Sequence, residues 1–275
     1  MTAPRDQPAD ASLSRVLDRP LDTCRAMIAE FRQAPTEAFA KRNIRGRMEP
    51  VTDIDLRVQD LLTSAFRAGF PGTPVIAEER LASLPPLPPD CLLIDPIDGT
   101  RPLLAGEPYF AIAACLVRHG RPEQAVIDLP AFGLRLTAAP GGLHVGGDPS
   151  RLPAFKPADV LTSPRHVSQL SRLLRRDDTP GPRAVPVPTA TVKMLLVALG
   201  RAAAAVYLPG FDGAAPWDYA AGALAIAAAG GIARDDTGRD LARTTPALID
   251  GWAASATGTD LRLLGILNHP AEREA

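Results

Sequence analysis

Carboxylate side chains directly follow two apolar runs in the N-terminal part of the chain. The segment CLLIDPIDGT holds Asp95 and Asp98 three positions apart after four apolar residues, and Glu78 and Glu79 follow a second such run. A further acid, Asp218, precedes an alanine-rich stretch that is predicted to form a helix. Strand ends and helix starts meet at one edge of a sheet in α/β proteins, so we expect these acids to gather there. Such carboxylates repel one another unless a cation lies between them, and oxygen ligands favour Mg²⁺ or Mn²⁺.

This arrangement suits the hydrolysis of phosphate esters. Asp95 and Asp98 could hold two neighbouring ions roughly 3.5–4 Å apart, the usual spacing in two-metal sites. Gly99 would let the backbone approach a phosphate, and the hydroxyl of Thr100 could orient the attacking water. Taken singly, each acid is explained as easily by a solvated turn or a helix cap, and Asp218 more easily by a cap. The prediction therefore rests on the joint pattern.

Hydrophobic periodicity predicts the elements that would position these residues. Helices are expected at 13–31, where Pro20 would interrupt or start a helix, and at 53–68. Short strands are expected at 74–77 and 92–94, each ending at acids. The stretch from Tyr109 to His144 is typical of antiparallel β structure, with strands at 109–117, 124–128 and 133–138.

The second half of the chain alternates strands with helices. The expected strands are 159–162, 184–187 and 204–208, and the expected helices are 167–175, 191–199 and 218–229. This alternation predicts a layered α/β fold. We expect a disordered tail at 1–11, an N-terminal α+β subdomain at 12–150 that carries most of the metal ligands, and a C-terminal α/β subdomain at 151–275 that carries the last metal aspartate.

The bulk properties are typical of a globular protein. The 275 residues can bury a sizeable core, with 46% hydrophobic and 22% charged residues. A net charge of −1 gives no basic surplus for binding nucleic acid or an anionic membrane. The polar N-terminus lacks the apolar core of a signal peptide, and the longest apolar run is too short to span a bilayer. Three widely spaced cysteines predict reduced thiols and a cytoplasmic location.

The acid motifs together resemble the inositol monophosphatase family of lithium-sensitive, Mg²⁺-dependent phosphatases. The matching segments are VTDID at 51–55, AEE at 77–79, DPIDGT at 95–100, WDYAAG at 217–222 and a Gly-Gly pair at 230–231. The resemblance covers roughly residues 20 to 245. It implies an αβαβα sandwich of the sugar phosphatase type, usually a homodimer. The implied activity is hydrolysis of a small-molecule phosphate ester by in-line attack of a metal-activated water.

The resemblance also assigns a role to each acid. Glu78, Asp95 and the backbone carbonyl of Ile97 would hold the first Mg²⁺, and Asp95, Asp98 and Asp218 would hold the second. Glu78 would also reach a third ion through water, so two or three ions are expected in each site, with Mn²⁺ as a possible substitute.

The catalytic set implied by the resemblance consists of Asp55 and Thr100, which would polarise the nucleophilic water, together with Glu78. Glu79 matches a family acid near the metals whose role is less direct. The substrate-contacting residues are expected to be Gly99, Thr100, Arg101, Asp218, Phe211 and Asp212.

Several positions depart from the inositol-specific members of the family. Phe211, beside Asp212, stands where those members have an acid, and Pro188-Thr189-Ala190 replaces a Gly-Ser-Ala stretch that lines the sugar or inositol. Arg101 looks like the histidinol-phosphatase branch, whereas WDYAAG looks more like the inositol phosphatase and 3'(2'),5'-bisphosphate nucleotidase branches. The substrate therefore stays open among inositol phosphates, sugar phosphates, bisphosphate nucleotides and histidinol phosphate. We interpret Arg165-His166 as a solvated pair.

A protein that kept the fold and lost turnover is the remaining alternative. Such a chain would be a metal- or phosphate-binding regulatory protein. All the expected ligands, and both Asp55 and Thr100, are intact in the sequence, which favours the enzyme.

Overall fold

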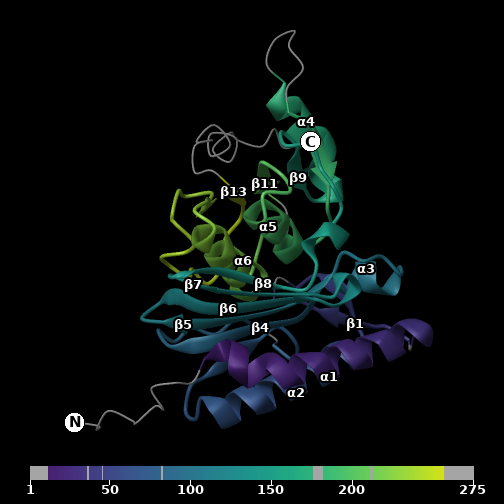
Figure 1. Ribbon diagram of the computed structural model, residues 1–275, viewed down its shortest axis with the longest axis vertical. Helices are drawn as coiled ribbons and strands as arrows, with labels where there is room; N and C mark the ends of the chain where they lie inside the picture. The colour runs from purple at the N-terminus through teal and green to yellow at the C-terminus, as the bar shows by residue number, and fades with distance from the viewer. Residues whose placement is uncertain are drawn as a thin grey trace.

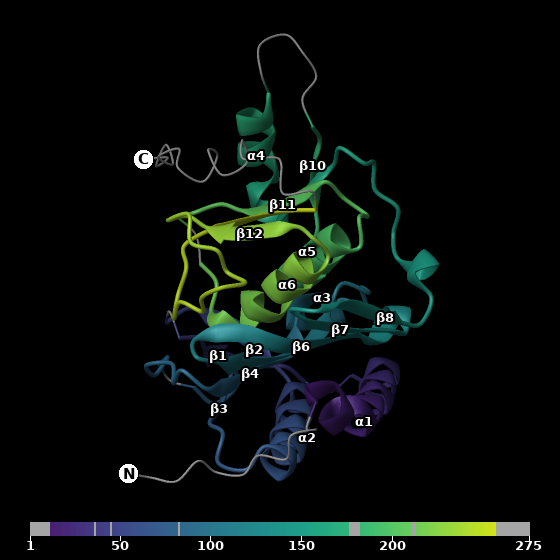
Figure 2. The ribbon, with the colours of Figure 1, turned by 60° about the vertical axis from the view of Figure 1, so that its left-hand side comes forward.

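The helices and strands are stacked in five layers, in the order helix, sheet, helix, sheet, helix (Figure 1). The computed structural model of the chain describes residues 12–35, 37–44, 46–81, 83–175, 182–210 and 213–256. The same order of layers is seen from a second direction in Figure 2. The predicted αβαβα sandwich is therefore confirmed, whereas the tail expected at 1–11 lies outside the described residues.

Two long helices, α1 (Leu13–Gln33) and α2 (Asp53–Gly69), form the outer layer beneath the larger sheet (Figure 2). Our prediction that Pro20 would interrupt or start a helix is wrong, because α1 is continuous and Pro20 lies inside it. An internal proline costs a helix about 3 kcal/mol. Here the cost is offset by one apolar face of α1 that is buried along its whole length, from Leu13 to Phe31.

The larger sheet has six strands in the order β3-β4-β5-β6-β7-β8. Its strands are β3 (Val75–Ala77), β4 (Cys91–Asp98), β5 (Ala111–Arg118), β6 (Arg121–Leu129), β7 (Leu134–Ala139) and β8 (Gly142–Gly146). Only β3 and β4 run parallel, and all other neighbours are antiparallel, as the pattern between Tyr109 and His144 predicts.

We expected strand β4 to end before its acids, but it continues through Asp95 to Asp98. The register shifts between these two residues, so that Asp95 pairs with Ala113 and Asp98 pairs with Ala111. In a regular strand, residues three apart point to opposite faces of the sheet. The extra residue of a bulge brings them to the same face. The irregularity therefore turns both carboxylates toward the central helices.

The central helices α5 (Ala190–Ala198) and α6 (Pro216–Ala228) separate the two sheets, and α4 (Val167–Leu174) covers the far side of the smaller sheet (Figure 1). The smaller sheet has the order β10-β9-β11-β13-β12. Its strands are β9 (Val160–Thr162), β10 (Ala184–Pro186), β11 (Ala204–Tyr207), β12 (Ile232–Asp235) and β13 (Trp252–Ser255). The last two strands were not predicted, because four-residue segments such as WAAS show little alternation.

The remaining elements are short. A hairpin of β1 (Phe39–Arg42) and β2 (Met48–Val51) precedes α2, and the single-turn helix α3 (Thr100–Leu104) follows β4. Three 3₁₀ helices lie at Pro130–Phe132, Pro149–Arg151 and Pro164–His166.

The main core lies on both sides of α5 and α6, where side chains from both sheets meet. The chain passes from the larger to the smaller sheet between β8 and β9, which is where we place the subdomain boundary near residue 150; that boundary stays a prediction. All three cysteines are buried free thiols, as expected. No helix within the described ranges is both long and apolar enough to cross a membrane.

Candidate active site

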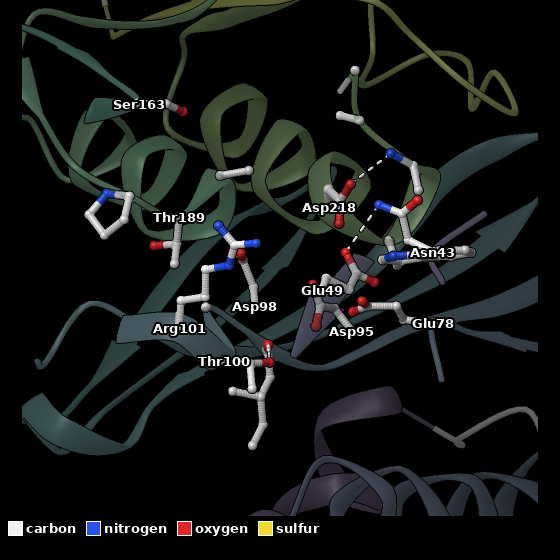
Figure 3. Close-up of a pocket in the computed structure, with 18 of the residues that line it drawn as sticks. Asn43, Glu49, Glu78, Asp95, Asp98, Thr100, Arg101, Ser163, Thr189 and Asp218 are labelled. Carbon is white, nitrogen blue, oxygen red and sulfur yellow. Dashed lines mark hydrogen bonds between the residues drawn. The ribbon is translucent and has the colours of Figure 1, made fainter. Parts of the chain in front are cut away.

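The predicted acids surround one cavity of about 560 Å³ between the larger sheet and the central helices. Glu78 follows β3, Asp95 and Asp98 lie on the last part of β4, and Asp218 lies in the first turn of α6. Figure 3 shows Glu78, Asp95 and Asp218 gathered at one end of this cavity, together with Glu49 from β2. We call this group the acid end. The structure thus brings together carboxylates that are up to 169 positions apart in the sequence.

Burial favours the protonated form of three carboxyl groups of the acid end, Glu78, Asp95 and Asp218. Asp95 is 1% exposed, and its Oδ1 is buried without a hydrogen-bond partner. Burial first, and then the charges of Glu78, Asp98 and Asp218, raise the pKa of Asp95 well above its usual range. Burial also raises the pKa of Glu78 to about 8, helped by the charges of Glu79, Asp218 and Glu49 and opposed by Lys41. Burial and the charge of Asp98 raise the pKa of Asp218 to about 7. A divalent cation would supply the missing charge, so the donor set fits the predicted metal chemistry.

The ammonium of Lys41, from β1, already contacts this group. Its Nζ lies 2.9 Å from Glu78 Oε1, 2.6 Å from Glu79 Oε1 and 3.3 Å from Glu49 Oε1. Within the described ranges, no three His, Cys, Asp or Glu side chains are arranged to hold a metal ion as they stand. Lys41 therefore competes with a cation for the charge of Glu78 and Glu79.

Asp55 and Thr100 lie beside the acid end and are hydrogen bonded to each other. Thr100 Oγ1 donates to Asp55 Oδ1 across 2.9 Å, and the backbone N–H and hydroxyl of Thr52 both donate to Asp55 Oδ2, at 2.8 and 2.6 Å. Asp55 is fully buried, which raises its pKa, while these hydrogen bonds act in the opposite direction. The capping box at the start of α2 thus fixes the carboxylate that holds the Thr100 hydroxyl.

The turn from β4 into α3 brings the backbone close to the cavity. Gly99 has φ +104°, and a Cβ on it would lie 2.4 Å from Thr189 Cγ2 and 2.8 Å from Tyr109 O. Only glycine can occupy this position without strain. The carbonyl of Ile97 lies within 3.4 Å of Thr100 Oγ1, and Arg101 is exposed on the cavity wall.

Asp98, at the end of β4, is hydrogen bonded to the first turn of helix α5. The backbone N–H of Thr191 donates to Asp98 Oδ2 across 2.7 Å. Asp98 therefore acts as an external cap for α5, much as Asp218 Oδ2 accepts the N–H of Ala215 and caps α6. Capping and metal binding are compatible here, because each carboxylate keeps a second oxygen.

Most of the predicted site residues line or adjoin the cavity, whereas Phe211 and Asp212 lie outside the described residues. The interpretation of Arg165-His166 as a solvated pair is wrong for His166, which is fully buried, because its ring packs edge-on against Tyr207 at 4.7 Å. Arg165 is exposed but lines the cavity.

Sequence reasoning missed several residues of the cavity. Glu49 enters it only because β1 and β2 pair, and no motif marks that pairing. Ser163 carries no signal of its own. Lys193 does carry one, since it is the single charged residue in the apolar helical run ATVKMLLVA, and a charge in such a run is seldom buried without a reason.

The chain matches known proteins over most of its length. The inositol monophosphatase family model matches residues 20–267. A fructose-1,6-bisphosphatase/inositol-1-monophosphatase of Thermotoga maritima is 28% identical over 199 residues, which are 71% of this chain and 75% of that protein. A histidinol-phosphatase of Chlorobaculum parvum is 28% identical over 229 residues, which are 80% of this chain and 82% of that protein.

A solved structure has the same fold. It is an IMPase/NADP phosphatase complexed with Mg²⁺ and phosphate, to which this chain is 19% identical. The TM-score is 0.69, and the superposition covers 94% of this chain and 97% of that one.

Proposed function

The chain belongs to the inositol monophosphatase family, and from that premise we propose that it is a Mg²⁺-dependent phosphomonoesterase. Its substrate is a small polar phosphate ester, and its reaction is in-line attack of an activated water on phosphorus. The relatives named as phosphatases and the neighbour complexed with Mg²⁺ and phosphate support this activity.

One observation carries the proposal. The buried Asp95 has an oxygen without a hydrogen-bond partner, and it lies among acids whose pKa values are raised. A protein that only used these acids as helix caps would gain nothing from burying their charges together. We assign Glu78, Asp95, Asp98, Asp218 and the carbonyl of Ile97 as the residues that hold two or three Mg²⁺ ions, or Mn²⁺ in their place.

Bound Mg²⁺ would neutralise charge on the phosphate and the leaving alkoxide and lower the pKa of the attacking water. The chain's own contribution is to orient that water. Thr100 Oγ1 donates a hydrogen bond to Asp55, so its lone pairs remain free to accept a hydrogen bond from the water. Polarisation then passes from the water through Thr100 to the buried charge of Asp55. Gly99 and the first residues of α3 line the same cavity.

The test is phosphate release from a panel of phosphomonoesters, measured with Mg²⁺ and with EDTA. The panel holds inositol 1-phosphate, fructose 1,6-bisphosphate, 3'-phosphoadenosine 5'-phosphate and histidinol phosphate. We expect EDTA-sensitive release from at least one of them, and almost none from Asp95→Asn. A folded, Mg²⁺-binding protein that releases no phosphate would favour the regulatory alternative instead.

The histidinol-phosphatase and bisphosphate nucleotidase specificities remain alternatives within this activity. The relative from Chlorobaculum parvum and Arg101 on the cavity wall support the first. A homodimer, a cytoplasmic location and lithium sensitivity are implied by the family resemblance or the composition, and they stay predictions.

A further inference from the structure

The chain leaves the larger sheet directly after Glu78. Strand β3 ends at Ala77, and the backbone N–H of Glu78 makes one more bond to the sheet, to Ile94 O on β4 at 3.1 Å. Because β3 is the edge strand, no further strand lies beside the next residue, Glu79. Glu79 is nevertheless only 4% exposed, so its backbone N–H and C=O need partners inside the protein.

The side chain of Gln59, on α2, supplies both partners. Its Nε2 donates to Glu79 O across 3.0 Å, and its Oε1 accepts the N–H of Glu79 across 2.8 Å. An amide side chain carries a donor and an acceptor in one plane, so it can satisfy both groups at once, as a neighbouring strand would. The first of these groups belongs to the peptide that joins Glu78 to Glu79. Gln59 therefore restricts the backbone on which the carboxylate of Glu78 is carried.

The backbone of the following residue is strained. Arg80 has φ 68°, in the left-handed region that residues with a side chain seldom adopt. Its guanidinium bonds both carboxylate oxygens of Asp60, the neighbour of Gln59 on α2, at 2.5 and 2.9 Å. Both side chains are more than half exposed, so this ion pair adds little stability. Strain of this kind persists where the surrounding structure fixes the backbone, and it is typical of functional sites.

Helix α2 also carries the carboxylate of the Asp55–Thr100 pair. Asp55 lies four positions before Gln59, which places the two side chains on the same face of the helix. The helix packs beneath β4 and buries its apolar side chains there (Figure 2). One rigid element thus holds both the residue that would act on the water, through Thr100, and the backbone next to Glu78.

We propose that Gln59 is a positioning residue, which holds Glu78 in the orientation in which it binds Mg²⁺. This inference rests on the proposed phosphatase activity and adds a residue that neither the motifs nor the cavity reveals, since Gln59 does not line the cavity. If the two hydrogen bonds are lost, the backbone of Glu79 gains conformational freedom that must be lost again when an ion binds. Gln59 should therefore govern the affinity for Mg²⁺ more than the chemical step.

The first experiment is a calorimetric titration of Mg²⁺ without substrate. Gln59→Leu keeps a side chain of similar size and removes both hydrogen bonds. We expect it to raise the Kd for Mg²⁺ by about 10-fold or more, the usual effect of losing a residue that orients a metal ligand. Gln124→Leu is the matched control, because Gln124 Oε1 accepts the backbone N–H of Leu13 at 2.7 Å, away from the cavity. That variant should keep the original Kd.

The second experiment measures the rate of phosphate release against the Mg²⁺ concentration, with the best substrate of the panel. We expect Gln59→Leu to raise the Mg²⁺ concentration for the half-maximal rate by about 10-fold or more, with kcat at saturating Mg²⁺ nearly unchanged. A residue that only stabilised the fold would lower the amount of active protein, and hence the apparent kcat, without moving the Mg²⁺ dependence.

A milder variant applies if Gln59→Leu does not fold, as judged by circular dichroism. Gln59→Asn keeps an amide but is one carbon shorter, so it cannot keep both bonds to Glu79. It should weaken Mg²⁺ binding in the same direction and by a smaller factor. A folded Gln59 variant that binds Mg²⁺ as tightly as the original chain would overturn the positioning role.

The outcomes separate this inference from the phosphatase proposal. Phosphate release from the original chain together with unchanged Mg²⁺ affinity in the Gln59 variants overturns the positioning role alone. No phosphate release, but weaker Mg²⁺ binding in the variants, keeps the positioning role and overturns the phosphatase proposal. An original chain that neither binds Mg²⁺ nor releases phosphate overturns both.

Discussion

The hydroxyl of Thr100 donates a hydrogen bond of 2.9 Å to Asp55 Oδ1, and this bond joins the first turn of α3 to the first turn of α2. The two residues come from the motifs VTDID and DPIDGT, which lie 45 positions apart. Their contact places the Asp55 carboxylate, at the start of α2, against the Thr100 hydroxyl, which lines the cavity.

Removing this hydroxyl should impair the chemical step. We expect Thr100→Val to lower kcat by about 10²-fold or more, because the water loses the acceptor that orients it. Thr100→Ser keeps the hydroxyl and should retain most of the activity. Steady-state kinetics in saturating Mg²⁺ checks this. A Thr100→Val variant that keeps full kcat would contradict the role of this hydroxyl.

Neutralising Asp95 should separate stability from function. We expect Asp95→Asn to abolish Mg²⁺-dependent turnover. In EDTA the same variant should melt at least as high as the original chain, because it no longer buries a repelled carboxylate. Thermal melting with and without Mg²⁺ tests this. A variant that melts much lower in EDTA would mean that the charge of Asp95 stabilises the metal-free fold.

The metal-free protein should lose stability as the pH rises. Glu78 and Asp218 have pKa values of about 8 and about 7 in the folded state, against about 4 when unfolded. The folded state therefore binds more protons than the unfolded state between about pH 4 and pH 8. The stability that their protonation contributes is complete below pH 4 and is lost as the pH rises through the folded pKa values.

Melting temperatures measured in EDTA from pH 5 to pH 8.5 should accordingly decline. Mg²⁺ binds the ionised carboxylates, so it should flatten the decline, and Glu78→Gln should flatten it in part. A melting temperature in EDTA that rises over this range would contradict the raised pKa values.

Lys41 should act as a competitor of the metal. Although burial opposes it, the charges of Glu78 and Glu79 raise the pKa of Lys41, so the amine is charged at neutral pH. We expect Lys41→Met to lower the melting temperature in EDTA and to reduce the Mg²⁺ concentration needed for half-maximal binding, since Glu78 is released. Calorimetric titration of Mg²⁺ measures the second effect. Weaker Mg²⁺ binding in the variant would instead show that Lys41 helps to hold the ion.

The turn at Gly99 should tolerate no side chain. Gly99→Ala places a Cβ against Thr189 and the carbonyl of Tyr109 at a positive φ, and we expect it to cost about 2–4 kcal/mol of stability. Gly106→Ala is the matched control, because Gly106 also has a positive φ, but a Cβ added there would have no atom within 4 Å. That variant should cost about 1 kcal/mol. Urea denaturation compares them, and equal losses would exclude the clash as the cause.

Apart from Glu49, the acids of the site could be predicted from the sequence because each lies at a local feature that the sequence encodes. Glu78 follows an apolar strand, and Asp55 and Asp218 open helices that have an apolar face. The layered fold follows from the same periodicities. These signals lie in short stretches of the sequence, so they can be recognised without knowledge of the tertiary contacts.

The parts that could not be predicted depend on pairings between distant segments. Pro20 is typical of a helix break, yet α1 continues through it because its apolar face packs against α2 and the larger sheet. The bulge that turns Asp95 and Asp98 to one face exists only in the register of β4 against β5.

By itself the sequence determined which acids can bind cations and which elements carry them, because helix starts, strand ends and apolar periodicity are local properties. Only the tertiary structure decided that Asp98 caps α5 and leaves the hydroxyl of Thr189 unused. It also decided that Lys193 lies buried behind Ser163. A buried hydroxyl stays without a partner only when no neighbouring segment supplies one, and that depends on all the segments packed around it.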